Sequence, residues 1–354
     1  MFKNCILFIL IGLSLTSCKK ESKVLFDEDL TQNESLDTVP IIGSKWTTIT
    51  TENFQFKDLI SYDNELILAY LHGSNGRYGY SGTYNGITLN HQFGISGGGS
   101  AFDKFKVTQG DLYGVGLIGS HGAWKYISGS KGENWETFAK DWQNFRDIEI
   151  FNGKTIVVTG LSPYIKVKEG ASFVAMGDSF NRSVGEILVH QNELYAFGSF
   201  TKIGDRDIKY IAKWDGKMWQ PLGDGVSDNL SGPVNDACIF KDEIVVCGNF
   251  YDAGPVVANK IAKWDGNKWT GLDSDLGSFG TGINCLKPYG EQLIVGGLFE
   301  KIDGVYSTNI ITWENGEWKE LAEGVSEAIY NIEVHNGRLF VIQGYGLNQV
   351  LKLE

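Results

Sequence analysis

The chain repeats itself about every 46 residues, and this period constrains its fold more than any other feature of the sequence. Each copy contains an apolar run that begins just after a short polar turn. The run begins at seven places: Leu66, Leu112, Thr155, Leu194, Ile244, Leu293 and Leu339. Successive starting points lie 46, 43, 39, 50, 49 and 46 residues apart. Self-similarity at such a period is typical of propellers and repeat arrays.

Each copy reads as two β-hairpins. One is clearest in I-A-K-W-D-G-K-M-W from Ile211, where the Asp-Gly pair tolerates the positive φ of a tight turn. The other lies upstream, as in V-N-D-A-C-I-F-K-D-E-I-V-V-C from Val234. The strand cores are apolar on both faces, so both faces must be buried. We therefore expect an all-β, seven-bladed β-propeller with four antiparallel strands in each blade.

The two ends of the chain are the two halves of one interrupted repeat. N-Q-V-L-K-L-E at 348–354 aligns with N-K-I-A-K-W-D at 259–265, and G-S-K-W from Gly43 aligns with G-N-K-W from Gly266. The C-terminal blade should therefore take its outermost strand from about residues 45–49, which pairs an edge that would otherwise stay free. Trp46→Ala should cost ~3–5 kcal/mol if the indole is as buried as its repeat partners.

The repeats resemble a known group of proteins. The W-D-G-x-x-W units and the Gly296-Gly297 pair resemble kelch-type and related bacterial propeller repeats over residues 43–354. S-G-S-K-G-E-N-W at 128–135 resembles a degenerate Asp-box of sialidase-type propellers, with Ser130 where the Asp belongs. In those families the box is a structural turn, and sialidases typically have six blades. The resemblance therefore implies fold rather than activity.

The N-terminus resembles a bacterial lipoprotein signal. Residues 1–17 combine Lys3 with an apolar run, Ile6 to Leu13, that is too short to span a bilayer, and L-T-S-C resembles a lipobox. This implies cleavage before Cys18 and its modification by palmitate-type acyl chains, which would hold the protein at a membrane. An ordinary secretory signal is the alternative. Lys19 favours the outer membrane by analogy, and K-K-E-S-K resembles surface-export tethers of Bacteroidota.

The amino-acid composition indicates how the rest of the chain is divided and which partners it excludes. Residues 18–42 are polar and should form a flexible tether, and 43–354 should form the ring. The formal net charge of −12 and the lack of a basic patch argue against nucleic-acid binding. Beyond Cys18 the mature chain would hold Cys238, Cys247 and Cys285. Either the first two form a disulfide or all three are buried thiols.

Candidate binding residues gather on one end of the expected ring. The short hairpin turns fall on one end of the ring, which we call the turn end. Long variable loops fall on the opposite end, which we call the loop end. Aromatic rings beside short polar groups suit glycans or polar peptides. The candidates are His72, Arg77, Tyr78, Tyr80, His121, Trp124, Asp205, Arg206, Asp207, Tyr251, Asp252, Asp303 and Tyr306. Trp124 and Trp142 are chosen because they lie outside the repeat positions that blade packing explains.

No pattern of a catalytic centre emerges. The sequence lacks G-x-S-x-G, H-E-x-x-H and C-x-x-C motifs, so no catalytic residue and no metal site are assigned. We expect no cofactor; a calcium site at Asp273 and Asp275 lacks a full ligand spacing.

Two functions therefore remain. The favoured one is a monomeric, lipid-anchored cell-envelope propeller that binds or scaffolds a glycan or an envelope protein. The alternative is a glycan-active hydrolase or lyase with paired carboxylates at the channel mouth.

Overall fold

A computed structural model describes residues 45–49, 54–72, 78–85, 89–96, 102–118, 120–126, 135–140, 144–223, 230–272, 282–344 and 348–354. These residues belong to one compact unit, Leu36–Glu354. They form strands and loops only, so this part of the chain has no helix that could cross a bilayer. The predicted signal peptide, Cys18 and the tether lie outside the described residues.

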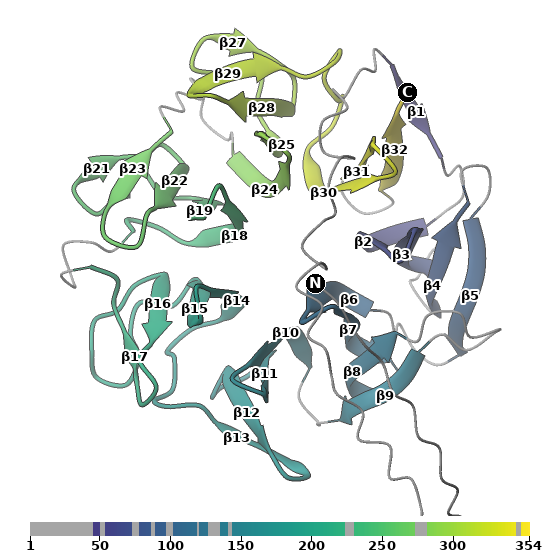
Figure 1. Cartoon of the computed structure of the whole chain (residues 1–354). Coiled ribbons are helices and arrows are strands. Elements are labelled where there is room, and N and C mark those ends of the chain that lie inside the picture. The colour runs from purple at the N-terminus through teal and green to yellow at the C-terminus, as the bar shows by residue number, and fades with distance from the viewer. Residues whose placement is uncertain are drawn as a thin grey trace, which may run out of the picture. The chain divides into compact units, whose positions relative to one another are not determined.

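Seven four-stranded antiparallel sheets form the blades of a ring (Figure 1). In each blade the first strand is innermost and the fourth outermost. Blade one contains β2 (Phe54–Tyr62), β3 (Glu65–His72), β4 (Tyr78–Tyr84) and β5 (Leu89–Ser96). Blade two contains β6 (Phe102–Thr108), β7 (Asp111–Ile118), β8 (Ser120–Tyr126) and β9 (Trp135–Lys140). Blade three contains β10 (Phe145–Phe151), β11 (Lys154–Thr159), β12 (Ile165–Glu169) and β13 (Ser172–Ala175).

The other four blades continue the same order. Blade four contains β14 (Val184–His190), β15 (Glu193–Gly198), β16 (Ile211–Trp214) and β17 (Trp219–Gln220). Blade five contains β18 (Val234–Phe240), β19 (Glu243–Gly248), β22 (Ile261–Trp264) and β23 (Trp269–Gly271). Blade six contains β24 (Gly282–Tyr289), β25 (Gln292–Leu298), β28 (Ile310–Glu314) and β29 (Glu317–Glu320). Blade seven contains β30 (Ile329–His335), β31 (Arg338–Gln343), β32 (Gln349–Leu353) and β1 (Trp46–Thr48).

The fold confirms the predicted propeller and its period. All seven predicted starting points are the second residue of a second strand, from Leu66 in β3 to Leu339 in β31. The apolar faces of neighbouring blades pack on each other, as Val158 of blade three does with Ile187 of blade four in one buried cluster. Burial on both faces explains why the strand cores lack the alternation of a half-exposed sheet.

The predicted ring closure is also confirmed. β1 pairs antiparallel with β32, and Trp46 lies opposite Leu353, in the register that Trp269 shares with Trp264. Trp46 is only partly buried, however, whereas Trp219 is fully buried. The predicted cost of Trp46→Ala is therefore too high, because less apolar surface is removed from water at Trp46 than at Trp219.

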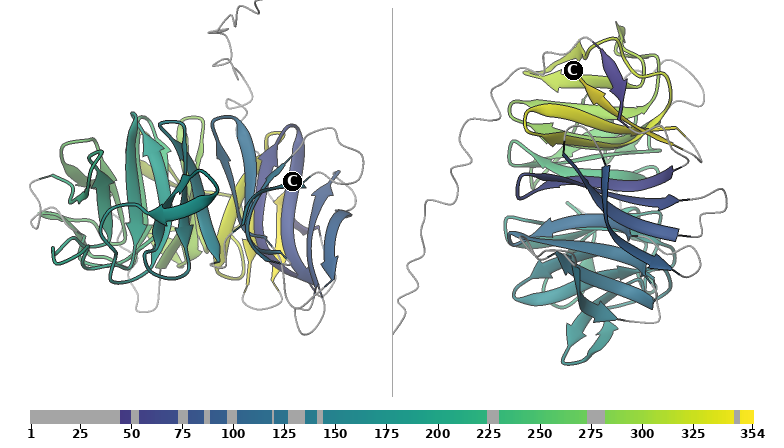
Figure 2. Two further views of the ribbon diagram at one scale, coloured as in Figure 1. Left: turned by 90° about the horizontal axis from the view of Figure 1, so that it is seen from below. Right: turned by 90° about the vertical axis from the view of Figure 1, so that its right-hand side faces the viewer.

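Figure 2 shows the ring edge-on, with the connections between strands at its two ends. Tight turns join first to second strands, and positive φ at Asn152 and Gly153 shows why Asn-Gly pairs recur there. In blades four, five and six the connections from second to third strands, at the loop end, are longer. Cys238, Cys247 and Cys285 are free thiols, so the predicted disulfide does not form; Cys247 and Cys285 are buried as the second alternative expects, and Cys238 is half-buried.

Candidate functional site

Three consecutive blades carry the same insertion at the loop end, between their second and third strands. It runs from Phe200 to Ile211 in blade four, Phe250 to Ile261 in blade five and Phe299 to Ile310 in blade six. In blades five and six it forms two-stranded hairpins, β20 (Asp252–Ala253) with β21 (Val256–Val257) and β26 (Lys301–Ile302) with β27 (Val305–Tyr306). We call these three segments the insertion hairpins.

Buried apolar residues hold each insertion hairpin on its blade. The leading Phe200, Phe250 and Phe299 are at most 2% exposed. Three residues further on, Ile203, Ala253 and Ile302 are fully buried. On the second arm Ile208, Ala258 and Ser307 are also buried, so the residues between the two sets of anchors are displayed on a rigid support.

The displayed residues include large exposed aromatic and apolar side chains. Tyr306 is 72% exposed, Val257 65% and Tyr251 61%. A lysine ammonium lies over each tyrosine ring: Lys260 Nζ is 5.3 Å from the Tyr251 centroid, and Lys301 Nζ is 6.0 Å from that of Tyr306. Exposed apolar groups bordered by charges are typical of interaction surfaces.

The hairpin of blade four is polar instead. Asp207 pairs with Lys202 at 3.5 Å, and Asp205 is exposed. Arg206 is half-buried: it lies 3.8 Å from Asp178 and donates a hydrogen bond of 3.3 Å to Gln220 Oε1. Its guanidinium is therefore directed at neighbouring loops.

The structure separates the predicted candidates into two groups. Asp205, Arg206, Asp207, Tyr251, Asp252, Asp303 and Tyr306 all lie on the insertion hairpins. The others belong to blades one and two, on the other side of the ring in Figure 1. There His72 and Tyr78 are register partners at the loop end of β3 and β4, and His121 lies opposite Leu117. Arg77 and Trp142 lie outside the described residues.

Two aromatic candidates pack inside blades instead of facing a ligand. Trp124 is 4% exposed, and its ring centroid lies 5.8 Å from that of Phe102. Tyr80 is half-buried and stacks on the buried Tyr70 at 5.7 Å. The prediction of Trp124 as a ligand contact is therefore wrong, because its place outside the tryptophan repeat reflects a different way of filling the same apolar core.

A polar cavity along the ring axis was not among the predictions made from the sequence. The first strands surround a space of about 670 Å³, lined by both charged and amide side chains. Every first strand has a β-bulge at the same place, and the residue after the bulge lines this space in six blades, whereas Asp147 of blade three is fully buried beside it. Around the ring these residues are Asp58, Lys104, Asp147, Glu186, Asp236, Cys285 and Asn331.

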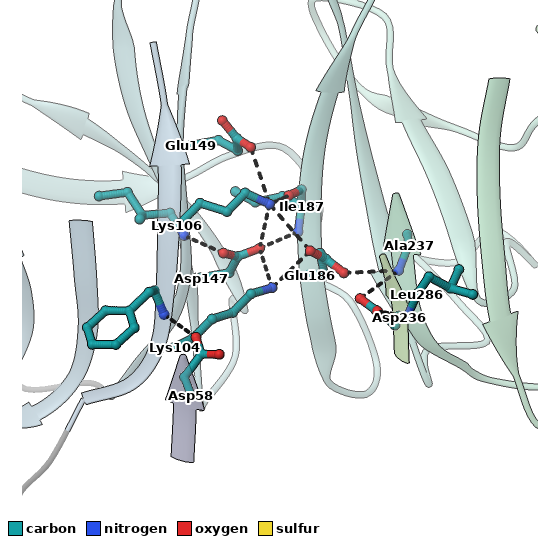
Figure 3. Close-up of polar contacts among 12 residues, drawn as sticks. Asp58, Lys104, Lys106, Asp147, Glu149, Glu186, Ile187, Asp236, Ala237 and Leu286 are labelled. Atoms are coloured by element: carbon teal, nitrogen blue, oxygen red, sulfur yellow. Dashed lines mark hydrogen bonds and ion pairs between the residues drawn. The ribbon is translucent and has the colours of Figure 1, made fainter. Parts of the chain in front are cut away.

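Four of these side chains bridge each blade to the next (Figure 3). Phe105 donates its backbone N–H to Asp58 at 2.5 Å, and Ile187 donates to Asp147 at 2.9 Å. Ala237 donates to Glu186 at 3.3 Å, and Leu286 donates to Asp236 at 2.7 Å. Asn331 closes the series by donating to Asp58. Bulges re-aim side chains in this way, and the carboxylates act as inter-blade supports.

Two lysines of blade two neutralise the acids beside them. Lys104 Nζ lies 2.9 Å from Glu186 and 3.4 Å from Asp147, and Lys106 lies 3.4 Å from Glu149 (Figure 3). Burial opposes ionisation of Glu186, but the two ammonium groups outweigh it and lower its pKa to about 2. The same acids raise the pKa of Lys104 above its usual range despite its burial.

Asp58 and Asp236 have no such close cation. Burial raises the pKa of each carboxyl to about 7, although backbone N–H groups oppose the shift. Such values are typical of functional acids, but here each carboxylate is already committed to holding the next blade. No group of three or more His, Cys, Asp or Glu in the described part of the chain is arranged for a metal ion.

A sequence signal for this cavity did exist. A charged or amide residue stands at the same place in six of the seven first strands, within an otherwise apolar run, as Asp147 does in F-R-D-I-E-I. The sequence pattern does not reveal the bulge, and the bulge decides which of these residues face the channel.

Comparison with solved structures places the chain among β-propellers. It is similar to YCF48 bound to D1 peptide, with 15% identity and a TM-score of 0.57 over 89% of this chain and 98% of that one. It is also similar to the WD40 propeller domain of Doa1, with 13% identity and a TM-score of 0.54 over 88% and 97% of the two chains. At these identities the likeness shows the fold alone.

A third similar structure differs at the ring closure. The β-propeller domain of the Trilobed protease from Pyrococcus furiosus has an open velcro topology; it matches with 13% identity and a TM-score of 0.55, over 86% of this chain and 96% of that one. In the present chain β1 closes the ring. Neither a protein-family model nor a curated protein matches the sequence. The protein is thus a seven-bladed β-propeller, a fold compatible with a binding or scaffold module.

Proposed function

We propose that this propeller is a non-catalytic binding module of the cell envelope, and that the insertion hairpins hold a protein partner. The observation that carries the proposal is the display of Tyr251, Val257 and Tyr306 on adjacent, rigidly anchored hairpins. Aromatic residues are enriched at protein interfaces, and exposed apolar side chains gain most when a partner covers them. The similar YCF48 structure, which holds a D1 peptide, offers a precedent for a propeller that binds peptide.

The alternative, a glycan-active enzyme, has weaker support. Glycoside cleavage needs two carboxyl groups that are free to exchange protons with the substrate. The channel carboxylates of Asp58, Asp147, Glu186 and Asp236 accept backbone N–H groups of the next blade instead. The loop acids Asp205, Asp252 and Asp303 each belong to a different blade. A calcium ion at Asp273 and Asp275 remains a prediction on residues outside the described ones.

The proposed location rests on the sequence. The lipobox-like L-T-S-C supports acylation at Cys18 and attachment to the outer membrane, with the binding end of the ring held near the envelope by a polar tether. Metabolic labelling with a palmitate analogue should mark the wild-type chain and leave Cys18→Ala unlabelled. Labelling of the alanine variant would contradict the anchor and favour the ordinary secretory signal.

Site-specific photo-crosslinking tests the binding surface. A photoreactive residue at position 306 or 257 of the full chain should capture a partner protein in intact cells, and Tyr251→Ser should weaken that capture. Lys154 is the matched control, since it is exposed at the turn end. Equal capture from position 154, or none from positions 257 and 306, would contradict the proposal.

A further inference from the structure

A second ring of side chains surrounds the axial cavity, one residue closer to the loop end than the bridging carboxylates. Each β-bulge inserts one extra residue into a first strand, as between Phe56 and Asp58 in blade one. All seven extra residues line the cavity of about 670 Å³. We call them the bulge ring; in blade order they are Lys57, Asp103, Arg146, Gly185, Asn235, Asn284 and Tyr330.

The bulge ring holds two cations that no other described residue neutralises. Lys57 of blade one is half-buried and Arg146 of blade three is exposed, and neither forms an ion pair or a hydrogen bond within the described part of the chain. The other lysines that line the cavity, Lys104, Lys106 and Lys287, each lie at most 3.4 Å from a glutamate. Lys57 and Arg146 are therefore the lining cations that remain available to an anion.

The acids near these two cations are already engaged. Asp103, the one acid of the bulge ring, has an interaction of its own. One residue deeper, Asp236 accepts the backbone N–H groups of Ala237 at 3.0 Å and Leu286 at 2.7 Å, and Asp58 is held in the same way. Burial raises the pKa of both Asp58 and Asp236 to about 7, so each carries only part of a charge at neutral pH.

The opposite side of the bulge ring offers hydrogen-bond acceptors. Asn235 donates its side-chain N–H to the Ile283 carbonyl at 3.0 Å, and Asn284 donates to the Ile329 carbonyl at 2.9 Å. These bonds fix the two amides and leave their oxygens without a donor among the described residues. Blades five and six, which carry them, lie across the ring from blades one to three (Figure 1). The bulge ring thus has a cationic side and an accepting side.

We propose that the bulge ring binds a small hydroxylated anion. Lys57 and Arg146 would hold its carboxylate or phosphate group, and its hydroxyl groups would donate to the amide oxygens of Asn235 and Asn284. A guanidinium matches the geometry of both kinds of anion. The cavity volume lies within the range of small-molecule sites. The proposal concerns other residues than the insertion hairpins, so either can fail without the other.

Calorimetric titration of the full chain tests the site with four probes. Galacturonate and gluconate carry a carboxylate, glycerol 3-phosphate carries a phosphate, and glucose carries hydroxyl groups without a charge. At least one of the three anions should bind with a Kd below about 1 mM, and glucose should not. The anion that binds most tightly distinguishes a carboxylate ligand from a phosphate ligand.

Four variants show whether the bulge ring makes the contact. Lys57→Gln and Arg146→Gln each remove a charged hydrogen bond and should weaken binding of the best anion about ten-fold. Their Tm should stay at the wild-type value, because neither side chain has a partner among the described residues. Lys154→Gln and Arg338→Gln are the matched controls: both replace exposed cations at the turn end and should bind as the wild type does.

Each part of the proposal can be overturned. Wild-type affinity in both Lys57→Gln and Arg146→Gln would show that these cations do not contact the anion. Binding of glucose as tight as that of galacturonate would show that charge is not recognised. If none of the three anions binds with a Kd below about 1 mM, the bulge ring is not a site for a small anion and serves only to shape the channel.

Discussion

Blade six and blade seven use the same repeat but are assembled differently. Blade six is continuous in sequence from β24 to β29, whereas blade seven joins three C-terminal strands to β1 from the N-terminus. In blade six the outer tryptophan, Trp318, is buried and hydrogen-bonded; in blade seven its counterpart Trp46 is partly buried and unpaired. The comparison teaches that a repeat specifies strands and register, while burial of the outer tryptophan depends on the neighbouring residues that pack against it.

The junction between these blades also differs on the channel side. Cys285 stands where four other blades present a carboxylate to the next blade. A β-carbon at Gly296 would lie 2.8 Å from side-chain atoms of both Ile329 and Ile332, so close apolar packing takes the place of the carboxylate bridge. Asn284 still donates to the Ile329 carbonyl at 2.9 Å. The junction between blades six and seven is thus held by packing, by this amide hydrogen bond and by an ion pair of Lys287 with Glu333 at 2.6 Å.

The largest predicted effect comes from removing the closing strand. Deletion of residues 43–50 exposes the edge of β32 and one face of its apolar core, so the ring should unfold early and over a broad range. We expect a Tm at least about 10 °C lower in a thermal melt. A sharp transition at the wild-type temperature would show that blade seven is stable with three strands.

Two alanine substitutions at equivalent positions measure the difference between the blades directly. Trp219→Ala removes a fully buried indole and its hydrogen bond, and should cost about 3–5 kcal/mol of unfolding free energy. Trp46→Ala should cost about half as much, because its indole is only partly covered. Denaturant unfolding of both variants checks this order, and equal costs would refute the inferred difference.

The pH dependence of stability distinguishes a carboxylate bridge from the Cys285 junction. Burial raises the pKa of Asp58 from 3.8 to about 7 in the folded ring, so the folded state binds this proton more tightly than the unfolded chain does. The stabilisation of the fold by protonated Asp58 is therefore fully present below about pH 4 and is lost as the pH rises to about 7. The loss should amount to about 2–4 kcal/mol.

Unfolding curves between pH 4 and pH 8 provide the measurement. Asp58→Asn should flatten the decline, although the variant is less stable at low pH because the amide nitrogen, unlike the hydroxyl oxygen of the protonated acid, cannot accept a hydrogen bond. Cys285→Ala is the matched control at the equivalent register position and should keep the wild-type slope. An unchanged slope in Asp58→Asn would mean that another group causes the decline.

The smallest effect is expected at the insertion hairpins. Tyr306→Ser removes a side chain that is 72% exposed, so stability should change by less than about 0.5 kcal/mol. Binding to the captured partner should nevertheless fall. A large loss of stability would show that Tyr306 supports the hairpin instead of displaying a contact surface.

Much of the fold could be predicted because its information is local. The Asp-Gly turn after Trp214 and the apolar runs on either side define a hairpin without reference to the rest of the chain. Even the closure was visible, since the repeat unit starts at one terminus and ends at the other. The site was harder. Tyr251 and Tyr306 could be predicted as exposed loop residues, but Trp124 could not be recognised as buried.

The sequence by itself determined the number of blades, the register of their strands and the origin of the closing strand, because hydrophobic period and turn chemistry act between near neighbours. Only the tertiary structure decided which polar residues face the channel and which indole lacks an acceptor. Those properties depend on how a bulge turns Asp58 or Asp147 toward the next blade and on how completely neighbouring residues cover Trp46. Both are set by contacts between blades that lie far apart in the chain.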